Sequence, residues 1–347
     1  MRLSWIDIAK GLGIFLVILG HLITIGSPIF KWIGSFHMPL FFFLSGLVFN
    51  YNNNLLNSLK TIFARLILPY ILIIVIIYLL ISLLIPPWHP KSIIITLFEV
   101  FYTGIPYSLH AAHLWFLICL ASVQILFIII KKLKLTKEKE YLIIVISVMF
   151  SLSIGFVYTH YLNKFCLFKL YLIPRLPFNI ETALMALFFF YLGHELKEQK
   201  IIVMFNNIKV SIKLVVVIVS LSANVILGTI LNGDVSLAHN NYQNPVLYLV
   251  SAVCGITFIV GVSNIINRSF ILEFYGKYSL PIYLFHIYFI YLFAFLLSTF
   301  LGKKMMFMIN IPLVYCFVGL IFVLVLSLPI PRLYKNSIGV ISNKCLK

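Results

Sequence analysis

Long hydrophobic runs alternate with short polar segments along the whole chain. Windows of about 20 apolar residues, the length of helix that crosses a bilayer, occur at about ten places. They lie near residues 5–25, 32–50, 65–86, 113–131, 141–160, 180–196, 211–231, 245–266, 279–300 and 306–329. This pattern predicts an all-α polytopic membrane protein, a bundle of about ten transmembrane helices.

The composition supports this prediction and excludes the soluble classes. Of 347 residues, 62% are hydrophobic and only 10% are charged, whereas soluble domains carry about 25% charged residues. The net charge of +17 would also fit a nucleic-acid partner. No basic stripe interleaved with aromatic residues accompanies it, so we expect a lipid bilayer as partner and no nucleic acid.

The positive charges sort to one side of the predicted membrane. With the N-terminus in the cytoplasm, 19 of the 26 Lys and Arg residues lie inside and 7 lie outside. The loop KKLKLTKEKE at residues 131–140 is the strongest inside marker. The positive-inside rule therefore predicts an even number of spans, both termini in the cytoplasm, and a multi-pass protein of the cell (inner or plasma) membrane.

No low-complexity linker or soluble segment divides the chain. We expect a single transmembrane domain at residues 1–335 and a short basic cytoplasmic tail at 336–347. The five cysteines, at 119, 166, 254, 316 and 345, are odd in number and scattered. This spacing predicts neither a disulfide framework nor a metal site.

Three ionisable residues interrupt the first hydrophobic run: Asp7, Lys10 and His21. Each costs roughly 2.5–3.5 kcal/mol in a membrane unless it finds a partner or a wet cavity. A helix turns about 100° per residue, so all three fall near one stripe, with His21 about 16 Å along the axis from Lys10. This stripe is the sharpest sign of chemistry in the sequence.

Each residue of the stripe has a functional and a structural interpretation. His21 can serve as a general base, because a neutral imidazole accepts protons near neutral pH, or it can hydrogen-bond between helices. Lys10 can meet the phosphates of a cytosolic cofactor or anchor its helix at the interface. Arg65, before the third span, is a phosphate ligand or a positive-inside marker.

Further polar residues lie in or beside the predicted spans, and for most of them a structural role is expected. They are His37, His113, Glu181, His194, Glu195 and His286. Glu181, close to Arg175, is a candidate for binding a sugar hydroxyl or a cation. The outer loops at 87–112 and 161–179 carry aromatic residues beside cations, which suits a sugar ring, a lipid headgroup or an interfacial aromatic belt.

Several catalytic signatures are missing from the sequence. It contains no GxSxG elbow, no GxxxxGK[ST] loop, no HExxH and no Cys/His metal spacing. A secondary transporter or polysaccharide exporter is the main alternative, because ten spans with buried His and Glu suit proton coupling. That class predicts internal pseudo-symmetry, and no clear repeat is present.

Six segments together resemble the acyltransferase-3 family of membrane O-acyltransferases, and within it the fucose 4-O-acetylase-like branch. They are DIAKGLGIFLVILGH, FHMPLFFFLSGLVF, ARLILPY, HLWFL, PFNIETALMALFFFYLG and GKYSLPIYLFH, in that order between Trp5 and His286. The family has an essential basic residue followed, after ten residues, by a histidine. Lys10 and His21 fit that spacing, although the family more often has arginine at the first position.

The resemblance implies an O-acyltransferase that takes an acyl group, most simply acetyl, from cytosolic acetyl-CoA without a metal. Its acceptor would be a hydroxyl of a cell-surface or lipid-linked glycan such as an O-antigen polysaccharide. The family's motif residues place His21 and His37 in catalysis and Lys10 and Arg65 at the donor, with Arg175 and Glu181 proposed at the acceptor. The chain is similar to stand-alone members that lack the SGNH domain.

Overall fold

The computed structural model describes residues 3–52, 54–84, 93–106, 109–157, 176–199, 201, 205, 207–305 and 312–341. Within these ranges every regular element is a helix, so the all-α prediction is confirmed. The helices form two compact units, each built from segments that are distant in sequence. Unit 1 contains residues 1–44, 196–236 and 242–336, and unit 2 contains 45–195, 237–241 and 337–347.

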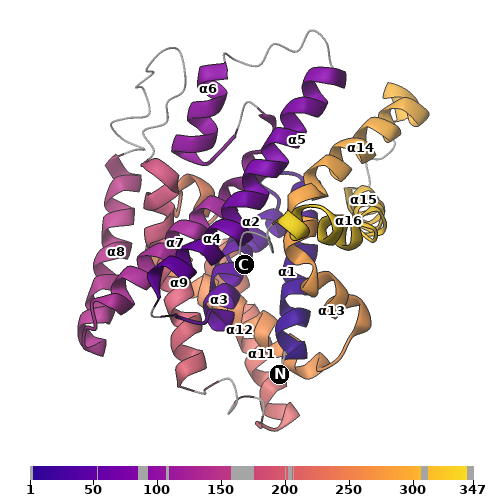
Figure 1. The fold of residues 1–347 in the computed structure, drawn as a ribbon. Coiled ribbons are helices and arrows are strands. Elements are labelled where there is room, and N and C mark those ends of the chain that lie inside the picture. Colours follow the sequence, from indigo (N-terminus) through magenta and orange to yellow (C-terminus); the bar gives the residue numbers. More distant parts are fainter. Residues whose placement is uncertain are drawn as a thin grey trace. The chain divides into compact units, whose positions relative to one another are not determined.

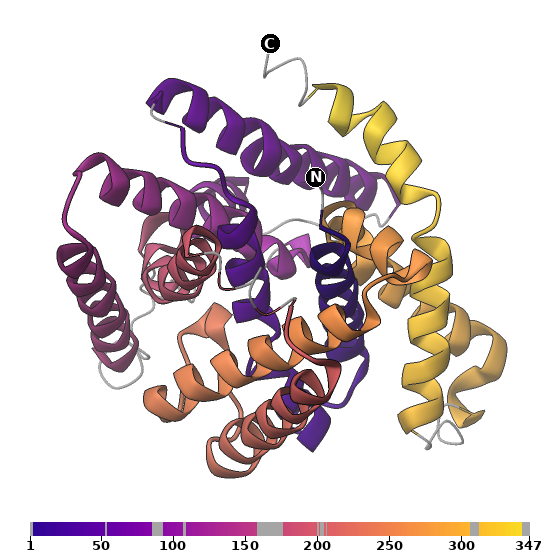
Figure 2. The same cartoon turned by 90° about the horizontal axis from the view of Figure 1, so that it is seen from below.

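Unit 1 is organised around α1 (Ser4–Leu22). It further contains α2 (Pro28–Gly34), the start of α3 (His37–Val48), α11 (Val210–Asn224), α12 (Pro245–Ile266), α13 (Phe270–Lys277), α14 (Ser279–Met305), α15 (Pro312–Leu326) and α16 (Ile330–Asn336). The helix α1 contacts α12, α13, α14 and α15, with its closest packing along α13 (Figure 1). In the view from below, α11 lies along α12 (Figure 2).

Glycines allow α13 to approach α1 at backbone distance. A Cβ added to Gly276 would lie 1.7 Å from the carbonyl oxygen of Asp7, and one added to Gly11 would lie 2.2 Å from that of Leu272. Neither position accepts a side chain without separating the helices. The pairing also shows that α13 runs antiparallel to α1, so residue 276 lies beside the turn that carries Lys10.

A buried asparagine connects three segments of unit 1. The amide Nδ2 of Asn224, at the end of α11, donates to Ser35 Oγ at 3.0 Å and to the Ser251 carbonyl at 2.7 Å. The next residues form a π-helical turn, Val225–Leu231, whose Gly228 packs against Ser35. Hydrogen bonds and packing from α11 and α12 therefore fix the short connection between α2 and α3, which precedes His37.

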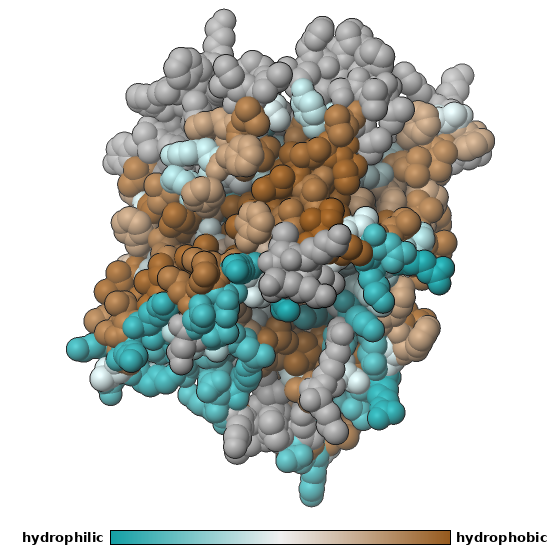
Figure 3. Space-filling model, viewed as in Figure 1, coloured by the Kyte–Doolittle hydropathy of each residue, from teal (hydrophilic) through white to brown (hydrophobic). Residues whose placement is uncertain are grey.

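Unit 2 is organised around α7 (Trp115–Lys132), which is buried continuously from Trp115 to Val123. It also contains α4 (Leu55–Ile62), α5 (Leu68–Leu84), α6 (Ile93–Phe98), α8 (Lys137–Val157), α9 (Ile180–Glu198) as far as Glu195, and the rest of α3. Figure 3 shows hydrophobic surface over α5, where Val75, Ile76 and Leu79 are exposed. Exposed apolar side chains on a helix of this kind fit contact with lipid.

Eight helices in the described residues are long and apolar enough to cross a membrane, so the protein is multi-pass. They account for eight of the ten predicted windows. The window 32–50 is split at Ser35 and Phe36 between α2 and α3. The window 180–196 is α9, which carries Glu181, Glu195 and Lys197 and is therefore less apolar.

The predicted outer loop at 87–112 is partly helical, because α6 continues into a π-helical turn, Glu99–Thr103. In this helical segment the ring centroids of Phe98 and Tyr102 are 4.6 Å apart and the rings stack. The two aromatic side chains thus pack against each other within one helical segment. At the other end of the chain, helix extends to Ile341 within the expected tail. The PWHP segment and most of the loop at 161–179 lie outside the described residues.

Candidate active site

Two histidines that are distant in sequence meet in unit 1. His21 lies in the last turn of α1, and His286 lies in the second turn of α14. Their ring centroids are 5.3 Å apart, with the ring planes tilted by 45°. The His21 side chain is exposed, whereas His286 has 0% exposure. Protein thus leaves one imidazole uncovered, and a second imidazole lies behind it.

His37 is the third member of this histidine cluster. It begins α3, and its Nδ1 lies 2.7 Å from the carbonyl oxygen of Ile33. The segments on either side of His37 pack on α1, because Gly20 lies against Ile33 and Gly13 lies against Leu40. The chain therefore brings both histidines that the sequence predicted as catalytic into one region of unit 1.

Two of the three rings have a defined tautomer. A carbonyl oxygen only accepts hydrogen bonds, so His37 Nδ1 must donate to Ile33, and His286 Nδ1 must donate to the Tyr283 carbonyl at 2.7 Å. In the neutral ring the second nitrogen, Nε2, then carries the lone pair. Both residues thus present an accepting nitrogen on the edge away from their own helix.

The opposite end of α1 carries Lys10, the cation that is the candidate for binding the acyl donor. Asp7 is buried and Lys10 is partly buried in the segment that Gly276 covers. Lys277 follows that glycine and is exposed. Lys10 and His21 are on the same helix, so about 16 Å along its axis separates the cationic end from the exposed histidine.

The comparison with protein families decides what class of enzyme this geometry belongs to. A family model described as an acyltransferase domain matches residues 3–331, nearly the whole chain. The chain belongs to the acyltransferase-3 family. No curated protein and no solved structure gave a match.

Family membership makes the chain a membrane acyltransferase with an acyl donor and an acceptor, which favours this class over the transporter and exporter alternatives. The fucose 4-O-acetylase-like branch and the stand-alone form stay predictions. The expectation that no metal takes part also stays a prediction. Among the residues that the structure describes, no group of three or more His, Cys, Asp or Glu side chains is arranged to hold a metal ion.

The remaining predicted site residues lie in unit 2 or outside the described ranges. Arg65 is exposed in a π-helical turn, Phe63–Ile67, a rare geometry that often marks functional positions. Glu181 is 1% exposed in the first turn of α9. Phe178 and Asn179, just before it, both have positive φ, at 59° and 55°. Arg175 lies outside the described residues.

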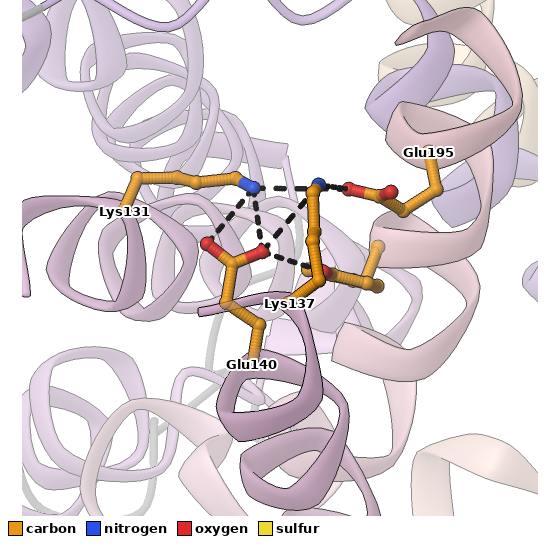
Figure 4. A network of polar contacts seen from close by, with 5 residues as sticks. Lys131, Lys137, Glu140 and Glu195 are labelled. Carbon is orange, nitrogen blue, oxygen red and sulfur yellow. Dashed lines mark hydrogen bonds and ion pairs between the residues drawn. The ribbon is translucent and has the colours of Figure 1, made fainter. Parts of the chain in front are cut away.

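Figure 4 shows a second polar cluster in unit 2, formed by Lys131, Lys137, Glu140, Tyr191 and Glu195 (the ion-pair network). Lys131 Nζ lies 2.8 Å from one Glu140 oxygen, and the Tyr191 hydroxyl donates to the same oxygen at 2.6 Å. Lys137 pairs with Glu195. The network joins the ends of α7, α8 and α9, which supports the structural role expected for Glu195.

The motif GKYSLPIYLFH contains both Lys277 and His286, but nothing in the sequence placed either residue beside the first helix. His286 was one of several polar residues in apolar spans, and Lys277 one of many inside cations. For His286, the available signals were this motif and its position eight residues into a hydrophobic helix. For Lys277, the signal was the preceding glycine, which in the fold permits close packing on α1.

Proposed function

We propose that the protein transfers an acyl group, most simply acetyl, from cytosolic acyl-CoA to a hydroxyl of a cell-surface or lipid-linked glycan. The observation that carries the proposal is the exposed His21 on the same helix as Lys10, in a chain of the acyltransferase-3 family. Acyl-CoA is a polyanion on the cytoplasmic side. Its phosphates need cations at the inner end of α1, and the hydroxyl that attacks its thioester needs a base farther along the helix.

Lys10 is the proposed ligand of the donor phosphates, and Lys277 is a second cation at the same end of α1. Charge-assisted bonds to phosphate are roughly twice as strong as neutral ones. On the family motif alone, Arg65 is also proposed as a donor-binding residue, because its guanidinium binds phosphate in a bidentate manner. The pantetheine arm would lie along α1 and bring the thioester toward His21.

In the reaction, a ring nitrogen of His21 takes the proton from the acceptor hydroxyl as the oxygen attacks the thioester carbonyl. The carbon–sulfur bond breaks, and the CoA thiolate leaves with the proton that His21 had accepted. In the alternative route, the His21 nitrogen attacks the thioester carbonyl, the carbon–sulfur bond breaks, and the CoA thiolate leaves. The acceptor oxygen then attacks the acylated ring, the acyl–nitrogen bond breaks, and the freed ring takes the hydroxyl proton and passes it to the thiolate. His37 is proposed as the second catalytic histidine in either route.

Glu181 and Arg175 are proposed to bind the acceptor. A carboxylate that is almost fully buried at the start of α9 suits a bidentate bond to neighbouring sugar hydroxyls. The left-handed Phe178 and Asn179 support the same region, because strained backbone is concentrated at binding and catalytic sites.

The proposal is tested with membranes from cells that carry or lack the gene. Radiolabelled acetyl-CoA is added, and the label that mild alkali releases from the glycan fraction is measured. Label that depends on the gene supports the proposal, and mass spectrometry of the glycans then locates the acetylated hydroxyl. Equal labelling in both membranes overturns acetyl transfer to a glycan.

A second experiment separates the two routes. The purified protein is incubated with acetyl-CoA without an acceptor, and its mass is measured after tryptic digestion. A peptide that carries an acetyl group on His21 in the wild type, and no acetyl group in His21→Ala, indicates the acyl-enzyme route. If no acetylated peptide forms, but acceptor added in a parallel reaction is acetylated completely in a single turnover, the acceptor attacks the thioester directly.

A further inference from the structure

His286 is the most completely buried member of the histidine cluster. It lies in α14 with 0% exposure, its ring is 5.3 Å from that of His21, and the Tyr283 ring flanks it at 5.6 Å. A polar side chain inside a membrane segment is costly and calls for an explanation. A hydrogen bond to the carbonyl three residues earlier in its own helix satisfies Nδ1, but it does not explain the contact with His21.

The tautomer of His286 fits it for a specific task. Because Nδ1 is held as the donor by the Tyr283 carbonyl, Nε2 is the accepting nitrogen of the neutral ring. A histidine that acts as general base works best when a third group orients its ring and accepts a hydrogen bond from its other nitrogen. His286 offers such an acceptor beside His21, in the same unit and from a different helix.

We propose that His286 is the positioning residue for His21. This inference rests on the proposed function. A ring N–H of His21 donates to Nε2 of His286, which leaves the other His21 nitrogen unprotonated and aimed at the acceptor hydroxyl. When that nitrogen takes the hydroxyl proton, the same hydrogen bond stabilises the imidazolium until the proton passes to the CoA thiolate.

Two isosteric substitutions separate this role from simple packing. In His286→Gln the side-chain amide reaches the position of Nε2, and in His286→Asn it reaches only the position of Nδ1. We expect His286→Asn to lower kcat for acetyl transfer about 10- to 100-fold with an unchanged KM for acetyl-CoA, since an oriented hydrogen bond is lost. His286→Gln should keep about a third of the wild-type kcat or more.

Activity is measured per folded molecule, from the monodisperse fraction in detergent. His194→Asn is the matched control, because His194 is also buried but packs against Phe127 in unit 2. A packing role for His286 predicts a different result. Both substitutions would then lower the thermal midpoint and leave kcat per folded molecule at the wild-type value, which would overturn the proposal.

Non-additivity gives a second readout. If His286 acts only through His21, its substitution has little left to remove once His21 is gone. His286→Asn should therefore change the residual rate of His21→Ala by less than about twofold. A further tenfold loss in that background would mean that His286 works without His21, and the proposal would be wrong.

A third measurement does not require activity. Diethyl pyrocarbonate modifies unprotonated imidazole, and the exposed His21 is accessible to it. We expect the rate at His21, followed by peptide mass spectrometry, to fall several-fold in His286→Asn and to stay near wild type in His286→Gln. Equal rates in all three proteins overturn the proposal.

Wild-type membranes that transfer no acetyl label overturn the proposed function instead, and the modification rates still decide the role of His286.

Discussion

The two polar clusters differ in how their groups are satisfied. In the ion-pair network of unit 2, two lysines face two glutamates, the charges sum to zero, and Lys131 also lies over the rings of Phe127 and Tyr191. The histidine cluster of unit 1 contains an exposed ring backed by a buried one. The first arrangement fastens helix ends, and the second leaves a proton acceptor within reach of a ligand.

Charge alone is therefore a poor guide to chemistry in this membrane protein. The residues with the strongest ionic contacts join α7, α8 and α9, and their charged groups pair with one another. Of the residues proposed for catalysis, His21 is exposed and His37 is partly exposed. Changes in unit 1 should therefore alter rates, and changes in the ion-pair network should alter stability.

The largest effect is expected for His21→Ala. Loss of the general base should lower acetyl transfer by about 10²–10⁴-fold, while the thermal midpoint and the yield of folded protein stay near wild type. The measurement is transfer from radiolabelled acetyl-CoA, normalised to folded protein. His239→Ala removes another exposed histidine and should keep full activity. More than about a tenth of the wild-type rate in His21→Ala would contradict its role as base.

The next effect is expected for Lys10→Met, which keeps much of the apolar stem and removes the charge. We expect the KM for acetyl-CoA to rise about tenfold or more, because a charge-assisted bond to phosphate is lost. Lys10→Arg should stay close to wild type, as arginine also binds phosphate. If both variants instead lose folded protein and keep the donor KM, Lys10 is an interfacial anchor.

Glu140→Gln tests the other side of the comparison. It leaves Lys131 without its closest carboxylate, so we expect a loss of about 2 kcal/mol in the free energy of unfolding, since the network is partly exposed. The thermal midpoint in detergent should fall, and kcat per folded molecule should not change. A fall in kcat at an unchanged midpoint would show that the network belongs to the catalytic machinery.

The smallest effect is expected for Lys277→Met. Its exposed side chain is one of several proposed phosphate contacts, so the KM for acetyl-CoA should rise only about two- to fivefold. Comparison of acetyl-CoA with its 3′-dephospho form shows which phosphate is concerned. Lys209→Met, at another exposed lysine, serves as the control. Equal KM values for both variants would exclude Lys277 from the donor site.

The sequence by itself determined the class of the protein and the stripe of the candidate site. Apolar runs of span length predict helices because a bilayer leaves no other way to satisfy the backbone. Helical periodicity alone places Lys10 and His21 on one helix at a known separation. Both inferences depend only on residues that are close in sequence, and the motifs of the first two spans also carried the family resemblance.

Only the tertiary structure decided which distant residues join that stripe. The contact of His286 with His21, the approach of Gly276 to Asp7, and the bond from Asn224 to Ser35 each connect residues from separate helices. Hydropathy specifies that a helix enters the membrane but not which of its faces meets which neighbour. That choice depends on side-chain packing, close glycine contacts and pairing of buried polar groups, which become defined only when the helices assemble.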